Sequence, residues 1–211
     1  MPSTLLFPAA EVLPTGAQRA PYLKELVDWA DELAAISVEQ ALTAFFGQPL
    51  DPRTLRLTGL HHVAAYLGDY RAEEEFEAWL EAVRESPGVS RVSTGPSHIA
   101  PRVHGTPGHW INLHTERGTE VEFFTCRSYG RWAELEPERK CSLMSHLGLS
   151  VDTPDQVGRL LDYLAGFDAI ELLAYAPEDE LGHTYGHLLR TDTERVLELV
   201  HAGRPAPGET P

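Results

Sequence analysis

Four residues whose side chains can bind a metal or move a proton recur at matching positions in two similar parts of the sequence. LHHVAAYLGD at 60–69 resembles MSHLGLSVD at 144–152, which matches His62 with His146, 84 residues apart. GHWINLHTERGTEVEFFT at 108–125 resembles GHLLRTDTERVLELVH at 186–201, which matches Glu122 with Glu198, 76 residues apart. Imidazole and carboxylate together suit a borderline divalent ion, and either can accept a proton. The pattern predicts a duplicated unit.

The elements that carry these residues follow the same order in both copies. The first copy is expected to contain a strand at 60–67, an amphipathic helix ending near Val83, a strand at 89–93 and a hairpin of strands 109–115 and 119–126. The second has a strand at 144–151, a helix opened by Thr153-Pro154, a strand at 169–175 and a hairpin of 186–191 and 195–201. Asp69 suits the N-cap of the first helix. Each copy is therefore a βαβββ module.

The remaining segments lie outside the duplication. An irregular arm over 1–17 precedes two helices, one starting near Pro21 and one capped by Ser37 and ending near Gly47. We expect an N-terminal extension over 1–58, a duplicated domain over 59–202 and a flexible tail over 203–211. The domain divides into module one at 59–127, a polar linker at 128–142 and module two at 143–202.

Composition excludes several classes of partner. A formal net charge of −15 argues against nucleic acid and anionic membranes, because no basic stripe can neutralise phosphates. The sequence has no long apolar run and no signal-peptide pattern, so a cytoplasmic location is expected. Small molecules are the expected ligands, and a homodimer is left open. Cys126 and Cys141 are read as reduced thiols, since two cysteines make no disulfide framework.

Two βαβββ modules in tandem resemble the vicinal oxygen chelate superfamily, which includes glyoxalase I, methylmalonyl-CoA epimerase, extradiol dioxygenases and bleomycin resistance proteins. HHVAAYLGD and SHLGLSVD resemble the opening strands of the family, and VEFFT and LELVH resemble its closing strands. The resemblance covers roughly residues 59–202. It implies an α+β fold in which the two modules form a half-barrel cleft around a divalent metal ion, which would be Zn, Ni, Co, Mn or Fe.

The resemblance also implies a set of metal ligands, two from each module. They are His62, Glu122, His146 and Glu198. A strand glutamate is commonly solvated and a strand histidine commonly a core residue, but a match at four equivalent positions favours the ligand set. Glu120 is the rival of Glu122 on the same face, yet it aligns with Val196. His61 lies on the opposite face and is not expected to bind metal.

Other histidines and Cys126 are weaker candidates. His109 and His187 are matched in the two copies, and roles near the metal, in substrate binding or in structure are all left open. The loop histidines His98, His104 and His183 are expected to be exposed. Cys126 shares the face of Glu122 and is a candidate for the pocket, but an unactivated thiol is mostly protonated at neutral pH and is not assigned as a nucleophile.

A ligand set of two histidines and two glutamates resembles bacterial-type glyoxalase I. It leaves about two positions of an octahedral shell for adjacent substrate oxygens. The metal then acts as a Lewis acid, and Glu122 or Glu198 acts as the general base. We therefore expect a metal-dependent isomerase or lyase that acts on a small oxygenated molecule by proton abstraction. The N-terminal helices and the long loops at 94–108 and 127–142 differ from a minimal glyoxalase I.

Two alternatives remain from the sequence. An Fe(II) dioxygenase would use His62, His146 and Glu198, with a non-ligand where Glu122 stands. A metal-free protein that binds or sequesters a small molecule would use none of the four as ligands.

Overall fold

The protein is described from a computed structural model that covers residues 6–7, 10–179 and 182–203. The chain divides into two compact units. Unit one comprises Met1–Ile36 and His62–Leu147, and unit two comprises Ser37–His61 and Gly148–Pro211. Strands β1 (Leu57–Tyr70) and β5 (His146–Val151) each continue from one unit into the other.

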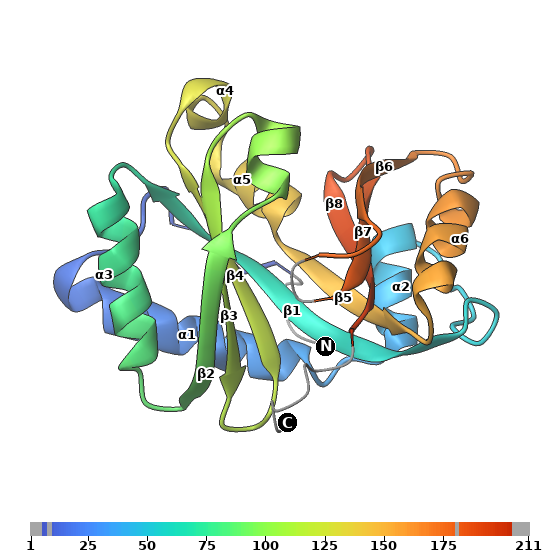
Figure 1. The fold of residues 1–211 in the computed structure, drawn as a ribbon, viewed down its shortest axis with the longest axis horizontal. Coiled ribbons are helices and arrows are strands. Elements are labelled where there is room, and N and C mark those ends of the chain that lie inside the picture. The colour runs from blue at the N-terminus through green and yellow to red at the C-terminus, as the bar shows by residue number, and fades with distance from the viewer. Residues whose placement is uncertain (1–5, 8–9, 180–181, 204–211) are drawn as a thin grey trace. The chain divides into compact units, whose positions relative to one another are not determined.

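Unit one contains the first βαβββ module. After β1 come α3 (Glu73–Arg84), β2 (Val89–Pro96), β3 (Gly108–Thr115) and β4 (Glu120–Arg127). The strand order in this unit is β2-β3-β4-β1 (Figure 1). Strands β1 and β4 are parallel, whereas β2–β3 and β3–β4 are antiparallel. The parallel pair brings the strand of the first histidine beside the strand of the first glutamate.

Helices cover the sheet of unit one with apolar faces at helical spacing. Helix α3 buries Phe76, Trp79, Leu80 and Val83, as its pattern predicted. Helix α1 (Arg19–Leu33), preceded by a short 3-10 turn at Gly16–Gln18, packs against α3. The arm before it is also attached, because the indole of Trp79 donates to the carbonyl of Pro14 at 2.7 Å.

Unit two contains the second module. Its elements are β5, α6 (Pro154–Leu164), β6 (Ile170–Ala176), β7 (Thr184–Arg190) and β8 (Arg195–His201), with strand order β5-β8-β7-β6. Helix α6 packs on β7 and β8 (Figure 1). Helix α2 (Val38–Phe46) contacts β8; it begins with a capping box at Ser37 and ends at Gly47, whose φ of 71° is a left-handed cap.

The expected α+β class and the two βαβββ modules are confirmed, as are the two N-terminal helices. The structure adds that α1 belongs to unit one and α2 to unit two. The half-barrel cleft and the domain limits stay predictions. The expected flexible tail at 203–211 lies outside the described residues from position 204 onward. Among the described residues, no helix is long and apolar enough to cross a membrane.

Asp69 is not a helix cap, contrary to expectation. Strand β1 continues to Tyr70, and the N-cap of α3 is Ala72, which makes no side-chain capping bond. A β-bulge between Tyr66 and Gly68 inserts one extra residue, so that Ala64 pairs with Glu122 and Asp69 pairs with Cys126. Six residues of β1, from Ala64 to Asp69, therefore lie opposite five residues of β4, which turns Asp69 to the same face as Glu122.

The polar linker between the modules contains two short helices and several buried side chains. It forms α4 (Gly130–Ala133) and α5 (Pro137–Met144), and it buries Trp132, Lys140 and Cys141. A five-residue π-helix, Ala100–His104, likewise lies in the loop before β3. Because α5 extends to Met144, strand β5 begins at His146, two residues later than expected.

Candidate metal centre

Three of the four proposed ligands meet within unit one. His62 precedes Ala64 by two residues on β1, and Ala64 lies beside Glu122 of β4. His146 is the first residue of β5. One oxygen of Glu122, Oε2, lies 3.7 Å from Nε2 of His62 and 3.9 Å from Nε2 of His146. The two Nε2 atoms are 3.3 Å apart, and both histidines are 6% exposed.

One of the two imidazoles is oriented by the main chain. Nδ1 of His146 lies 3.1 Å from the carbonyl oxygen of Met144, and this oxygen can only accept a hydrogen bond. Nδ1 therefore carries the proton, and Nε2 of His146 presents a lone pair towards His62 and Glu122. The ring of Phe124 packs against His146, with centroids 5.6 Å apart.

The donor atoms fit a divalent ion in type and spacing. Ligand atoms placed octahedrally at about 2.1 Å from a divalent ion are about 3.0 Å apart when adjacent and about 4.2 Å apart when opposite. The separations of 3.3, 3.7 and 3.9 Å lie between these values, so small side-chain movements would place the three donors around one ion. The same 3.3 Å spacing also allows a hydrogen bond between the two imidazoles, so metal content is the measurement that separates the two arrangements.

The structure favours Glu122 over Glu120 as the ligand. Glu120 accepts a hydrogen bond from the side-chain amide of Asn112 at 2.9 Å. Glu122, which pairs with Asn112 across the hairpin, instead directs its carboxylate to the two histidines. This geometry agrees with the alignment of the two modules, in which Glu122 matches Glu198 and Glu120 matches Val196.

Glu198, the fourth proposed ligand, lies in unit two on β8. It is buried and pairs across the hairpin with His187 of β7. Nε2 of His187 is 3.6 Å from Oε2 of Glu198, and the ring of Tyr185 meets that of His187 edge to face at 5.6 Å. An imidazole therefore stands beside this carboxylate.

The expected equivalence of His109 and His187 is wrong. His187 lies opposite Glu198, whereas the residue opposite Glu122 is Asn112. His109 lies opposite Thr125 on the other face of the hairpin, where it stacks on Phe76 at 3.9 Å and its Nε2 is 3.0 Å from Glu73. The hairpins differ in length, and the shared Gly-His dipeptide concealed this difference.

The remaining candidates are described by their own contacts and burial. The ring of His61, in unit two, faces that of His183 at 6.2 Å, and His183 lies 3.9 Å from Asp179. Cys126 is fully buried, and burial raises the pKa of its thiol well above the ordinary value, which agrees with its not being a nucleophile. His104 is not simply exposed: burial lowers its pKa to about 4.

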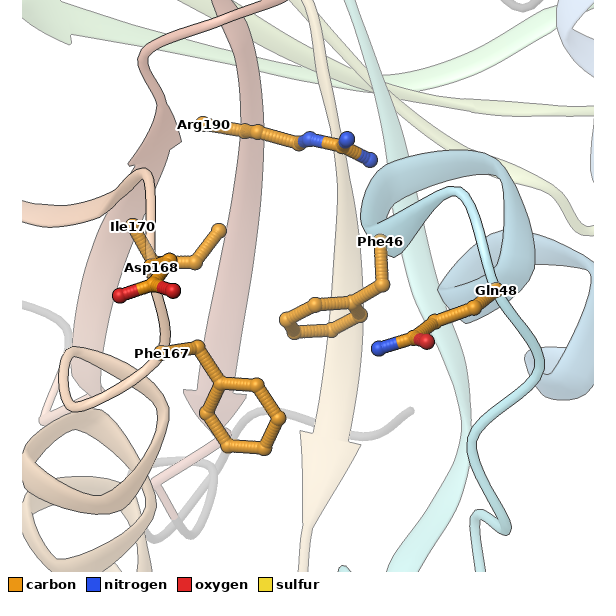
Figure 2. A pocket seen from close by; sticks show the side chains of 6 residues that line it. All are labelled: Phe46, Gln48, Phe167, Asp168, Ile170 and Arg190. Atoms are coloured by element: carbon orange, nitrogen blue, oxygen red, sulfur yellow. The ribbon is translucent and has the colours of Figure 1, made fainter.

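Unit two also contains a small surface pocket of about 210 Å³ (Figure 2). It is lined by Phe46, Gln48, Phe167, Asp168, Ile170 and Arg190. The guanidinium of Arg190 is already engaged, because it donates twice to Asp192 and once to the carbonyl of Phe45. None of the four proposed ligands lines this pocket.

No protein-family model and no curated protein match this chain. Solved structures with a similar fold include a methylmalonyl-CoA epimerase variant from Streptomyces coelicolor in complex with 2-nitronate-propionyl-CoA, at 14% identity and a TM-score of 0.42, covering 74% of this chain and 99% of that one. The methylmalonyl-CoA epimerase from Mycobacterium tuberculosis has 12% sequence identity and a TM-score of 0.44, and the match covers 70% of this chain and 90% of that one. A 4-hydroxymandelate synthase mutant from Streptomyces coelicolor has 15% identity and a TM-score of 0.44, and the match covers 73% of this chain and 51% of that one.

These structures come from the vicinal oxygen chelate superfamily, which the sequence resembles. At these identities and TM-scores the likeness assigns neither an activity nor a substrate to this chain.

Proposed function

We propose that the protein is a metal-dependent enzyme, an isomerase or lyase that removes a proton next to a metal-bound carbonyl of a small oxygenated molecule. The proposed ligands are the three residues that meet in unit one and, from its matched position in module two, Glu198. The observation that carries the proposal is the position of the Glu122 carboxylate, 3.7 and 3.9 Å from the two imidazole nitrogens.

The position of Glu122 favours proton transfer over oxygen activation. A dioxygenase of this type would use His62, His146 and Glu198 and would leave the position of Glu122 without a ligand. Here a carboxylate stands beside both histidines. Four protein ligands leave two positions for the adjacent oxygens of a substrate, and oxygen would have no separate position of its own.

The chain's own residues supply orientation and proton transfer. A divalent ion held by the four ligands would supply Lewis acidity, which lowers the pKa of a C–H bond beside a chelated carbonyl. The main-chain carbonyl of Met144 holds His146 in the tautomer that presents Nε2. Glu122 is the proposed base; its side chain is 20% exposed, so a proton that it accepts can exchange with solvent.

Metal analysis and isotope exchange together test this proposal. The purified protein should contain Ni, Co, Zn or Mn, and in D₂O it should incorporate deuterium next to the carbonyl in at least one of a panel of small α-hydroxycarbonyl compounds. Glu122→Gln should keep much of the metal, because an amide oxygen can still bind, but should lower exchange by about 10²–10⁴-fold because it cannot take the proton.

Glu120→Gln is the matched control on the same strand face and should exchange deuterium normally. Oxygen consumption with C–C bond cleavage that Glu122→Gln leaves unchanged would instead establish the dioxygenase. A protein that binds no metal would contradict the proposal and favour the binding-protein alternative.

A further inference from the structure

A buried ion pair lies on the metal-facing side of β1 in unit one. The bulge at Leu67 turns Asp69 to this face, where it is 2% exposed. Its Oδ2 accepts from Nζ of Lys140 at 2.8 Å, and Lys140 is 4% exposed. Its Oδ1 accepts from the indole of Trp132 at 2.8 Å and from the hydroxyl of Tyr66. Both oxygens of the carboxylate are therefore satisfied.

Stability alone does not explain the pair. Removing a carboxylate and an ammonium group from water is costly, and a well-packed apolar pair in the same place is often as stable or more so. A buried pair of this kind can instead specify one arrangement of the elements that it joins. Here it joins β1, through Asp69, to α5, through Lys140.

Helix α5 leads directly to the metal centre. Its last residue is Met144, whose carbonyl accepts from Nδ1 of His146. Ser145, between them, forms a second link to β1, because its Oγ accepts from the main-chain N–H of Tyr66 at 3.0 Å. Its own N–H donates to the carbonyl of Cys141 at 2.8 Å, the last turn of α5.

The end of α5 is thus attached to β1 at two places, Tyr66 and Asp69. The strand that receives both attachments also carries His62. Attaching the α5 end to β1 fixes the carbonyl of Met144, and with it the direction of His146, relative to His62.

We infer that Asp69, Lys140 and Ser145 are positioning residues of the metal centre, which hold His146 at the distance from His62 that metal binding requires. This inference rests on the proposed metal centre. It predicts that breaking the links weakens metal binding more than it weakens the fold.

The test is Co²⁺ binding by the full-length protein. Titration calorimetry measures the affinity, and the visible absorption spectrum of the bound Co²⁺ reports the geometry of its ligands. The double variant Asp69→Asn/Lys140→Met removes both charges but keeps an amide oxygen for Trp132 and Tyr66. Its affinity for Co²⁺ should fall about 10–100-fold, as for other outer partners of metal ligands, with a changed spectrum. Ser145→Ala should act in the same direction.

Asp192→Asn is the control, since it disrupts an exposed ion pair with Arg190 in unit two and should leave both readouts unchanged. Thermal unfolding of the metal-free double variant should remain close to that of the unaltered protein; if that variant does not fold, Ser145→Ala decides alone. Co²⁺ affinity and spectrum unchanged in the variants would overturn the inference while leaving the proposed function intact. An unaltered protein that fails to bind Co²⁺ would overturn both.

Discussion

The two closing hairpins carry equivalent glutamates in different surroundings. In unit one, Glu122 lies opposite Asn112, whose amide is bonded to Glu120. In unit two, Glu198 lies opposite His187, whose Nε2 is 3.6 Å from the carboxylate. Duplication preserved the carboxylates but not their neighbours. The two proposed ligands are therefore not interchangeable, and variants of the hairpins should not have equal effects.

The glycines of the two Gly-His dipeptides should show the largest difference. At Gly108 an added methyl group would lie 2.8 Å from the main-chain oxygen of Thr125 and from Cβ of Ala100, neither of which can turn away. At Gly186 its nearest neighbours are the terminal methyls of Leu161, which can adjust. Gly108→Ala should cost about 2–3 kcal/mol of unfolding free energy and Gly186→Ala about 1 kcal/mol, as measured by urea denaturation. Equal losses would mean that the packing of the two dipeptides does not differ in this way.

The residues opposite the glutamates should separate the hairpins in metal binding. His187→Gln changes the partner of a proposed ligand and should weaken metal affinity about tenfold, as changes to such partners do. Asn112→Ala removes a bond to Glu120 only and should have little effect. Calorimetric titration with Zn²⁺ measures both. A greater loss of Zn²⁺ affinity in Asn112→Ala than in His187→Gln would contradict this expectation and would indicate that Glu120 takes part in metal binding.

A smaller predicted effect is the contribution of His104, in unit one, to the loss of stability in acid. His104 has a buried Nε2 with no hydrogen-bond partner among the described residues, and burial lowers its pKa to about 4 from the ordinary 6.5. The unfolded chain therefore takes up this proton first. Its contribution to stability is full above pH 6.5 and is lost as pH falls from there towards 4. When the pH falls from 7 to 5.5, the His104→Gln variant should lose about 1 kcal/mol less unfolding free energy than the unaltered protein does. Urea denaturation of both proteins at the two pH values measures this difference. An unchanged pH dependence would show that His104 is protonated equally in both states.

Periodicity predicted the elements that have one apolar side. The apolar stripe of α3 and the alternation of buried residues along β3 follow directly from burial. The bulge at Leu67 was not predictable in this way, because one inserted residue leaves the apolar run unbroken. The burial of Lys140 was also hidden, since it depends on a partner 71 residues away.

The candidate site likewise has features that the sequence predicted and features that depend on tertiary contacts. The duplication identified His62, Glu122 and His146, which the structure brings together in unit one. It could not identify the carbonyl of Met144, because that contact depends on where α5 ends. The positions of Asn112 and His187 required the pairing register, because the residue opposite the glutamate is 10 positions before it in the first hairpin and 11 positions before it in the second.

The most direct test of the four-ligand centre is to compare the metal content of variants at the proposed ligands with that of a variant at the adjacent residue His61. The unaltered protein should bind about one divalent ion per chain. His62→Ala, His146→Ala and Glu198→Ala should each lose most of this metal, because each variant lacks one of the four proposed ligands. His61→Ala, one residue from a ligand but on the opposite strand face, should retain the metal in full. If His61→Ala lost the metal while His62→Ala kept it, the assigned strand face and with it the proposed centre would be wrong.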